Sequence, residues 1–66
     1  MHTVVRRGNK PDIWCVTASY QRAILIARLL RIDQRDHFAV LRGPLMLWNT
    51  NEDETITEIA KRIEGK

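Results

Sequence analysis

Few side chains in this sequence have the chemistry of a catalytic group. The candidates are Cys15, Ser19, His2 and His37. A nucleophile needs an activating base, and that base needs a group to orient it. Cys15 stands in an apolar, β-favouring run, which is typical of a buried and inert thiol. Ser19 is placed to cap a helix and His37 to begin a strand, so we expect a protein that is not an enzyme.

Metal and cofactor sites are not indicated. The cysteine at position 15 and the histidines at positions 2 and 37 lack the closely spaced ligand pair of a zinc site. Glu52, Asp53 and Glu54 are explained by the first turn of a helix, where negative charge is favourable. The glycines, at positions 8, 43 and 65, are scattered and form no phosphate-binding loop. We expect no metal, no cofactor and no internal disulfide.

The charge is rich in arginine and unevenly distributed. The formal net charge is +3 at pH 7, and residues 1–51 carry eight bases and three acids, whereas residues 52–66 carry three bases and five acids. A guanidinium group makes planar, bidentate contacts with phosphates or carboxylates. The basic part of the chain therefore indicates an anionic partner.

Length and hydropathy predict one small domain over residues 1–66. The 66 residues are 44% hydrophobic and 29% charged, which is the composition of a globular protein. The longest apolar run, residues 23–27, falls far short of the roughly 18 residues of a membrane span, so no membrane partner is expected. With a single thiol and no export signal, we expect a cytoplasmic protein, in the host cell if the gene is viral.

The first half of the sequence predicts a β-hairpin followed by a helix. Residues 3–7 and 13–17 are β-favouring and flank a run of turn formers. Residues 20–32 are mostly good helix formers, and Ser19 or Thr17 is in position to cap them.

The second half predicts one or two strands and a second helix. Residues 37–42 and 45–49 are separated by Gly43-Pro44, which forms either a tight hairpin turn or a bulge in one long edge strand. A helix capped by Asn51 follows, with apolar residues at i, i+3, i+4 and i+7 from Ile56. The order β-β-α-β-(β)-α predicts an α+β fold. We expect a two-layer sandwich, with two helices on one face of an antiparallel-rich sheet of three or four strands.

The predicted helix over residues 20–32 is apolar nearly all round. Ala23 and Ala27 lie on its buried side, whereas Arg28 and Arg31 lie roughly opposite them, beside Leu25. An apolar centre with an arginine rim is the composition of a protein interface. The candidate interface residues are Gln21, Leu25, Arg28, Arg31, Ile32 and Arg35 on this helix, Arg6 and Arg7 in the first hairpin, Arg42, and Trp48.

We therefore expect a small binding protein that docks on a larger protein complex with an acidic surface and inhibits or modulates it. Motif-free proteins of this size are typical of phages and plasmids, whose accessory proteins block host machines such as a polymerase, a nuclease or a CRISPR effector. For such docking, the double substitution of Arg28→Glu and Arg31→Glu is expected to abolish activity and leave the fold and the melting temperature nearly unchanged.

Two alternatives stay open. The same arginine face would suit DNA or RNA, with Trp14 and Trp48 stacking on bases if they lie on the uncovered side of the sheet. A homodimer or another obligate oligomer would also explain the surplus of apolar residues, and its stability would depend on concentration.

Overall fold

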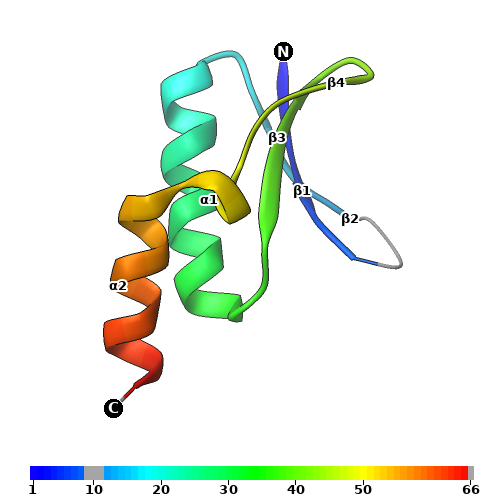
Figure 1. The fold of residues 1–66 in the computed structure, drawn as a ribbon. Helices are drawn as coiled ribbons and strands as arrows, with labels where there is room; N and C mark the ends of the chain where they lie inside the picture. The colour runs from blue at the N-terminus through cyan, green and yellow to red at the C-terminus, as the bar shows by residue number, and fades with distance from the viewer. Residues whose placement is uncertain (9–11, 66) are drawn as a thin grey trace.

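A computed structural model describes residues 1–8 and 12–65. It contains a four-stranded antiparallel sheet and two α-helices (Figure 1). In chain order, the elements are β1 (His2–Arg6), β2 (Asp12–Thr17), α1 (Tyr20–Gln34), β3 (Phe38–Arg42), β4 (Leu45–Asn49), the 3-10 helix η1 (Thr50–Glu52) and α2 (Glu54–Glu64). The predicted α+β class is confirmed, and the optional fourth strand is present. The first hairpin is confirmed too, although part of its loop lies outside the described residues.

The sheet has the strand order β2-β1-β3-β4, so β1 and β3 form its centre and β2 and β4 its edges. Val4 of β1 stands opposite both Cys15 of β2 and Val40 of β3. Residues directly opposite each other share a face, and successive residues of a strand alternate between faces. Val4, Cys15 and Val40 therefore lie on one face of the sheet, and their strand neighbours lie on the other.

Gly43 and Pro44 form the hairpin turn between β3 and β4, because Arg42 pairs with Leu45 across them. Gly43 has a φ of +60°, which glycine adopts at little cost, and proline fixes a negative φ at the next position. This combination is that of a type II′ turn. The sequence left open a tight hairpin turn or a bulge in one long edge strand at these residues, and the hairpin turn is correct. The register of the hairpin also shifts once. Leu41 pairs with Met46 and Val40 pairs with Trp48, so β4 has one extra residue, Leu47, at this point.

Helix α1 covers one face of the sheet. Val4, Phe38 and Val40 of the sheet are fully buried against Ala23 and Ala27 of α1. Because these alanines have small side chains, the helix backbone packs close to the central strands. The predicted inward side of the helix is therefore confirmed.

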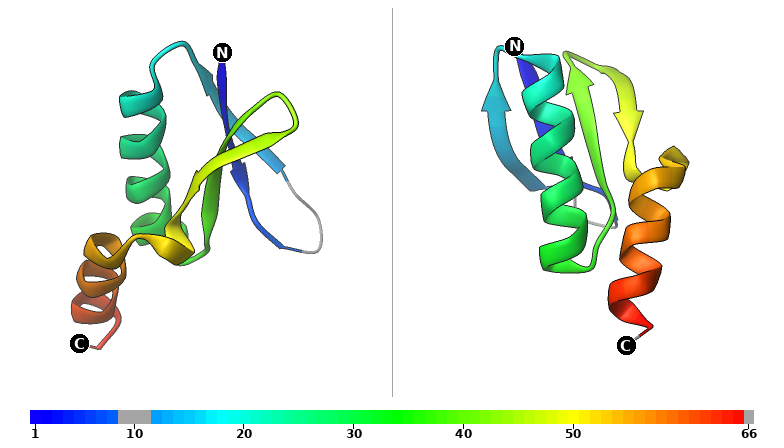
Figure 2. Two further views of the ribbon diagram at one scale, coloured as in Figure 1. Left: turned by 45° about the horizontal axis from the view of Figure 1, so that its top comes forward. Right: turned by 90° about the vertical axis from the view of Figure 1, so that its left-hand side faces the viewer.

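Helix α2 lies on the same side of the sheet as α1, but beside α1 and extending past the end of the sheet (Figure 2). Its buried residues, Ile56 and Ala60, belong to the predicted apolar stripe. It contacts chiefly α1 and η1. Neither helix covers the opposite face of the sheet, which we call the open face. No helix within the described ranges is long and apolar enough to cross a membrane.

The helix caps are partly those expected. Of the two predicted caps of α1, Ser19 and Thr17, Ser19 is the one that caps it. The prediction of Asn51 as the cap of the second helix is wrong, because Asp53 caps α2 and its Oδ1 accepts the N–H of Ile56 at 3.0 Å. The chain first forms η1, which Asn49 caps, and α2 begins only after that turn.

Candidate functional site

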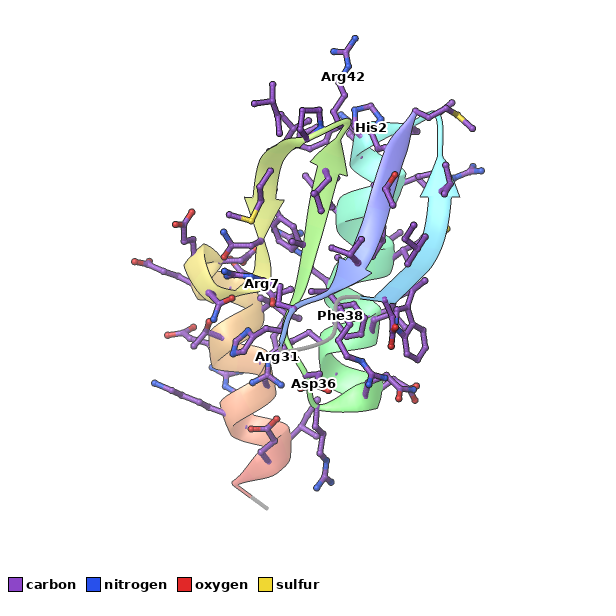
Figure 3. All side chains as sticks on the ribbon, turned by 90° about the vertical axis from the view of Figure 1, so that its right-hand side faces the viewer. His2, Arg7, Arg31, Asp36, Phe38 and Arg42 are labelled. Carbon is purple, nitrogen blue, oxygen red and sulfur yellow. The ribbon has the colours of Figure 1, made fainter. Side chains whose placement is uncertain are left out.

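The open face of the sheet is mostly apolar. The strand register places on it Thr3, Val5, Ile13, Val16, Ala39, Leu41, Met46 and Asn49. Ile13, Val16 and Met46 are 70, 50 and 49% exposed. Figure 3 looks onto this face, with β1 and β3 at its centre. None of these side chains is charged, and those of Ile13, Val16 and Met46 expose hydrocarbon to solvent.

A hollow of about 280 Å³ lies on the open face. Its lining residues are Val5, Arg6, Arg7, Gly8, Ala39, Leu41 and Met46. They come from β1 and the residues that follow it, from β3 and from β4. The hollow is therefore mostly apolar, with arginine at the end where β1 finishes.

Arg7 stands beside this hollow, held by two contacts. Its Nη1 donates a hydrogen bond to Oδ1 of Asn51 in η1 at 2.7 Å. Its backbone N–H donates to the carbonyl of His37 at 2.8 Å. Within residues 1–8 and 12–65, no carboxylate lies within ion-pair distance of Arg7. Since its side-chain partner is a neutral amide, the positive charge of Arg7 is not neutralised by an ion pair.

The other predicted arginines of the sheet do not join Arg7. The guanidinium of Arg6 lies 4.9 Å from the ring centre of Trp14, and its Nε lies 3.7 Å from Oδ2 of Asp36. Arg42 is exposed at the opposite end of the sheet (Figure 3). Arg7 and Arg42 therefore lie at opposite ends of the sheet, and Arg42, which alternates with Leu41, belongs to its α1 side. Arg6 is engaged within the fold.

Arg28 and Arg31 face α2, which corrects the expectation of an uncovered arginine face. The Nη2 of Arg28 lies 2.7 Å from Oδ2 of Asp53, and Nη1 of Arg31 lies 2.9 Å from Oε1 of Glu64. The side chain of Arg31 is only 13% exposed. These acids attract the arginines and bring α2 against this side of α1, a placement that helix periodicity does not reveal.

The remaining predicted residues of α1 are scattered around its outer side. Gln21 and Arg35 are exposed, and Ile32 is half-buried. Leu25 is 56% exposed. Leu29, which was not among the predicted interface residues, is 59% exposed. The spacing of residues 25, 29 and 32 would have revealed this outward apolar ridge.

Both tryptophans lie on the α1 side of the sheet. Trp14 meets the ring of Phe38 edge-on, with 5.6 Å between ring centres. Trp48 packs against the core, and the Arg28 guanidinium lies 5.9 Å from its ring centre. Stacking of these tryptophans on bases was expected only if they lay on the uncovered side of the sheet. Neither ring lies there, so this expectation does not hold.

Known families, curated proteins and solved structures offer no match to this chain. Its function must therefore be inferred from its own geometry. Within the described ranges, no cluster of three or more His, Cys, Asp or Glu side chains has the spacing of a metal site. Cys15 is half-buried against the core, and the Ser19 hydroxyl is used by the cap of α1.

One pairing of a hydroxyl with an imidazole has the distance of a catalytic pair. The Nδ1 of His37 lies 2.9 Å from Oγ1 of Thr50. Thr50 is fully buried, and its Oγ1 also accepts the backbone N–H of Phe38 at 3.0 Å. Burial, followed by the positive charges of Arg31 and Arg7, lowers the pKa of His37 below its usual value of 6.5. This pair joins η1 to the start of β3, and its hydroxyl is out of reach of a substrate.

Proposed function

We propose that this chain is a non-enzymatic binding protein that docks on a larger protein complex through the open face of its sheet. The observation that supports this most directly is the exposure of Ile13, Val16 and Met46 on the face that α1 and α2 leave uncovered. A domain of this size gains little stability from its own core, because that core is small. Large apolar side chains that stay in water instead of adding to the core therefore favour a role in association with a partner.

The arrangement of charge on this face supports a partner with an acidic surface. Arg7 lies at one end of the open face, beside an uncharged apolar centre. Interfaces have such an apolar centre and are enriched in arginine and methionine. The chain would act by stoichiometric occupation, inhibiting or modulating a host machine in the cytoplasm. The contact surface proposed here is thus the open face, and not the Arg28 and Arg31 side of α1 that the sequence predicted.

DNA or RNA binding is the second candidate. It is favoured by Arg7, Arg22 and Arg42, which have no carboxylate partner among the described residues. Binding to phosphates would weaken steeply as salt increases, because counterions are released from the nucleic acid. Fluorescence anisotropy with single-stranded DNA, duplex DNA and RNA at low and physiological salt separates this candidate from protein docking.

Site-specific photo-cross-linking in the native host tests the proposed face. A photoreactive amino acid replaces Met46 on the open face or, as a matched control, Glu58, which is exposed on α2. We expect a covalent adduct to one protein from position 46 and not from position 58. A third probe replaces Leu29 on the outer side of α1. If only this probe gave adducts, docking would lie on the helices and the proposal would be overturned. Absence of any protein adduct from position 46 would overturn it as well.

A further inference from the structure

The hollow on the open face has the size of an anchor site for a side chain. Its volume of about 280 Å³ is just below the range of roughly 300–1,000 Å³ that is usual for small-molecule pockets. Val5, Ala39, Leu41 and Met46 supply its apolar lining. A cavity of this size and lining suits an apolar side chain of a bound protein segment better than a whole cofactor.

The rim of the hollow has one charge available for a ligand, that of Arg7. Its Nη1 is fixed by the amide oxygen of Asn51, while its Nε and Nη2 have no partner among the described residues. A guanidinium held in this way can donate to a carboxylate without first breaking an ion pair.

The charges around Arg7 leave this end of the face positive. Asp36 and Glu64 are engaged by Arg6 and Arg31, respectively. With both acids paired, Arg7 is left as a cation that has no carboxylate partner among the described residues. An anionic group would therefore be favoured next to the apolar hollow.

We infer that the hollow anchors an apolar side chain of a partner segment that carries a carboxylate beside it, and that Arg7 binds this carboxylate. The inference rests on the proposed function, since it describes how the partner is recognised at the open face. Charge complementarity disfavours a second copy at this site. The strand residues that the structure describes on this face include no acid, so pairing it with itself would bury hydrocarbon but leave the charge of Arg7 unmatched.

Selection from a random peptide library displayed on phage tests this inference without knowledge of the natural partner. Bound peptides are expected to share an apolar residue next to Asp or Glu. For one synthetic peptide from this set, we expect Met46→Asp to weaken binding at least about tenfold, as expected for loss of an interface anchor. Leu29→Asp, on the outer side of α1, is the matched control and should change the affinity by less than about twofold.

Reversing the charge of Arg7 gives the sharpest outcome. Selection with Arg7→Glu should enrich Lys or Arg beside the apolar residue, in place of Asp or Glu. Arg7→Gln, which can still donate to Asn51, should bind the acidic peptides more weakly without this reversal. Because the substituted residues are exposed, each variant is expected to keep the wild-type fold, and circular dichroism checks this.

Four results would overturn the inference. These are the recovery of no binding peptide, peptides without acids, equal binding by Met46→Asp, or a dimer of this chain that Met46→Asp dissociates. A protein adduct from position 46 together with peptides that lack acids would leave the proposed function standing and reject only this anchor chemistry. Acidic peptides that bind the hollow while position 46 gives no adduct would reject the proposed function instead.

Discussion

Arg28 and Asp53 join the two helices through one carboxylate oxygen, since Nε and Nη2 of Arg28 lie 3.0 and 2.7 Å from Oδ2 of Asp53. The second oxygen of the same carboxylate, Oδ1, caps α2 by accepting the N–H of Ile56. A single buried side chain therefore both starts α2 and fixes it against α1. Because α2 has few contacts with the sheet, this link is central to its position.

Asp53→Ala removes the cap and the ion pair together. We expect it to lower the free energy of unfolding by about 2 kcal/mol at pH 7, whereas Asp53→Asn, which retains a capping oxygen, should cost about 1 kcal/mol. Urea unfolding measures both, with Glu58→Gln as an exposed control that should change stability by less than about 0.5 kcal/mol. Equal losses for the two Asp53 variants would show that the capping oxygen contributes nothing beyond the ion pair with Arg28.

The contribution of Asp53 is expected to depend on pH. Burial alone would raise the pKa of Asp53, but hydrogen bonds from the Ile56 N–H and the Arg28 side chain outweigh burial and lower the pKa below its usual value of 3.8. The stabilisation is therefore complete above pH 3.8 and is lost as pH falls through the lower pKa of the folded state. The difference between wild type and Asp53→Asn should shrink in urea titrations below that value.

Charge reversal of the α1 arginines is expected to destabilise the protein. Arg28→Glu and Arg31→Glu would place a carboxylate opposite Asp53 and Glu64, respectively, which repels α2. The structure thus reverses the expectation, drawn from the sequence, of an unchanged melting temperature. A drop of roughly 5–10 °C follows if the pair of substitutions costs about 1–2 kcal/mol. Calorimetry tests this, and the charge swap of Arg31→Glu with Glu64→Arg should recover part of the stability.

The fold could be predicted because its elements carry local signals. Ser19 before a run of helix formers, Gly43-Pro44 between apolar runs and the apolar spacing from Ile56 each specify an element from a few neighbouring residues. The cap of α2 was mistaken because Asn49, Asn51 and Asp53 all have capping side chains. Which of them serves depends on the 3-10 turn, and that turn is fixed by tertiary contacts of buried Thr50.

The candidate site was harder to predict because it depends on which surfaces stay uncovered. Arg28 and Arg31 were selected from helix periodicity, but their exposure depends on where α2 packs, a long-range property. The open face had a weaker signal in the sequence. The run of Ile13, Trp14, Cys15 and Val16 is apolar on both faces of its strand, which is typical of a strand buried on both sides. Since α1 covers only one side, the other is left exposed.

Thr50→Val tests the buried link between η1 and β3. The substitution keeps the shape of the side chain but removes the oxygen that accepts the N–H of Phe38 at 3.0 Å. An unsatisfied buried N–H costs about 1–3 kcal/mol, so we expect a loss of that size in urea unfolding. Thr50→Ser, which keeps the hydroxyl, should be clearly more stable than Thr50→Val. The reverse order would show that the methyl group matters more than this hydrogen bond.

His37 makes stability depend on pH near neutrality. Burial and the positive charges of Arg31 and Arg7 lower its pKa below 6.5, so the folded protein favours the neutral imidazole. The unfolded chain binds a proton near pH 6.5, and the stabilisation is therefore complete above this pH and lost as pH falls through the lower pKa of the folded state. Proton NMR of the His37 ring should give a midpoint below 6.5, and Arg31→Gln should raise it. The free energy of unfolding should fall from pH 7.5 to pH 5 in wild type and fall less in His37→Asn. A midpoint at or above 6.5 would contradict this assignment.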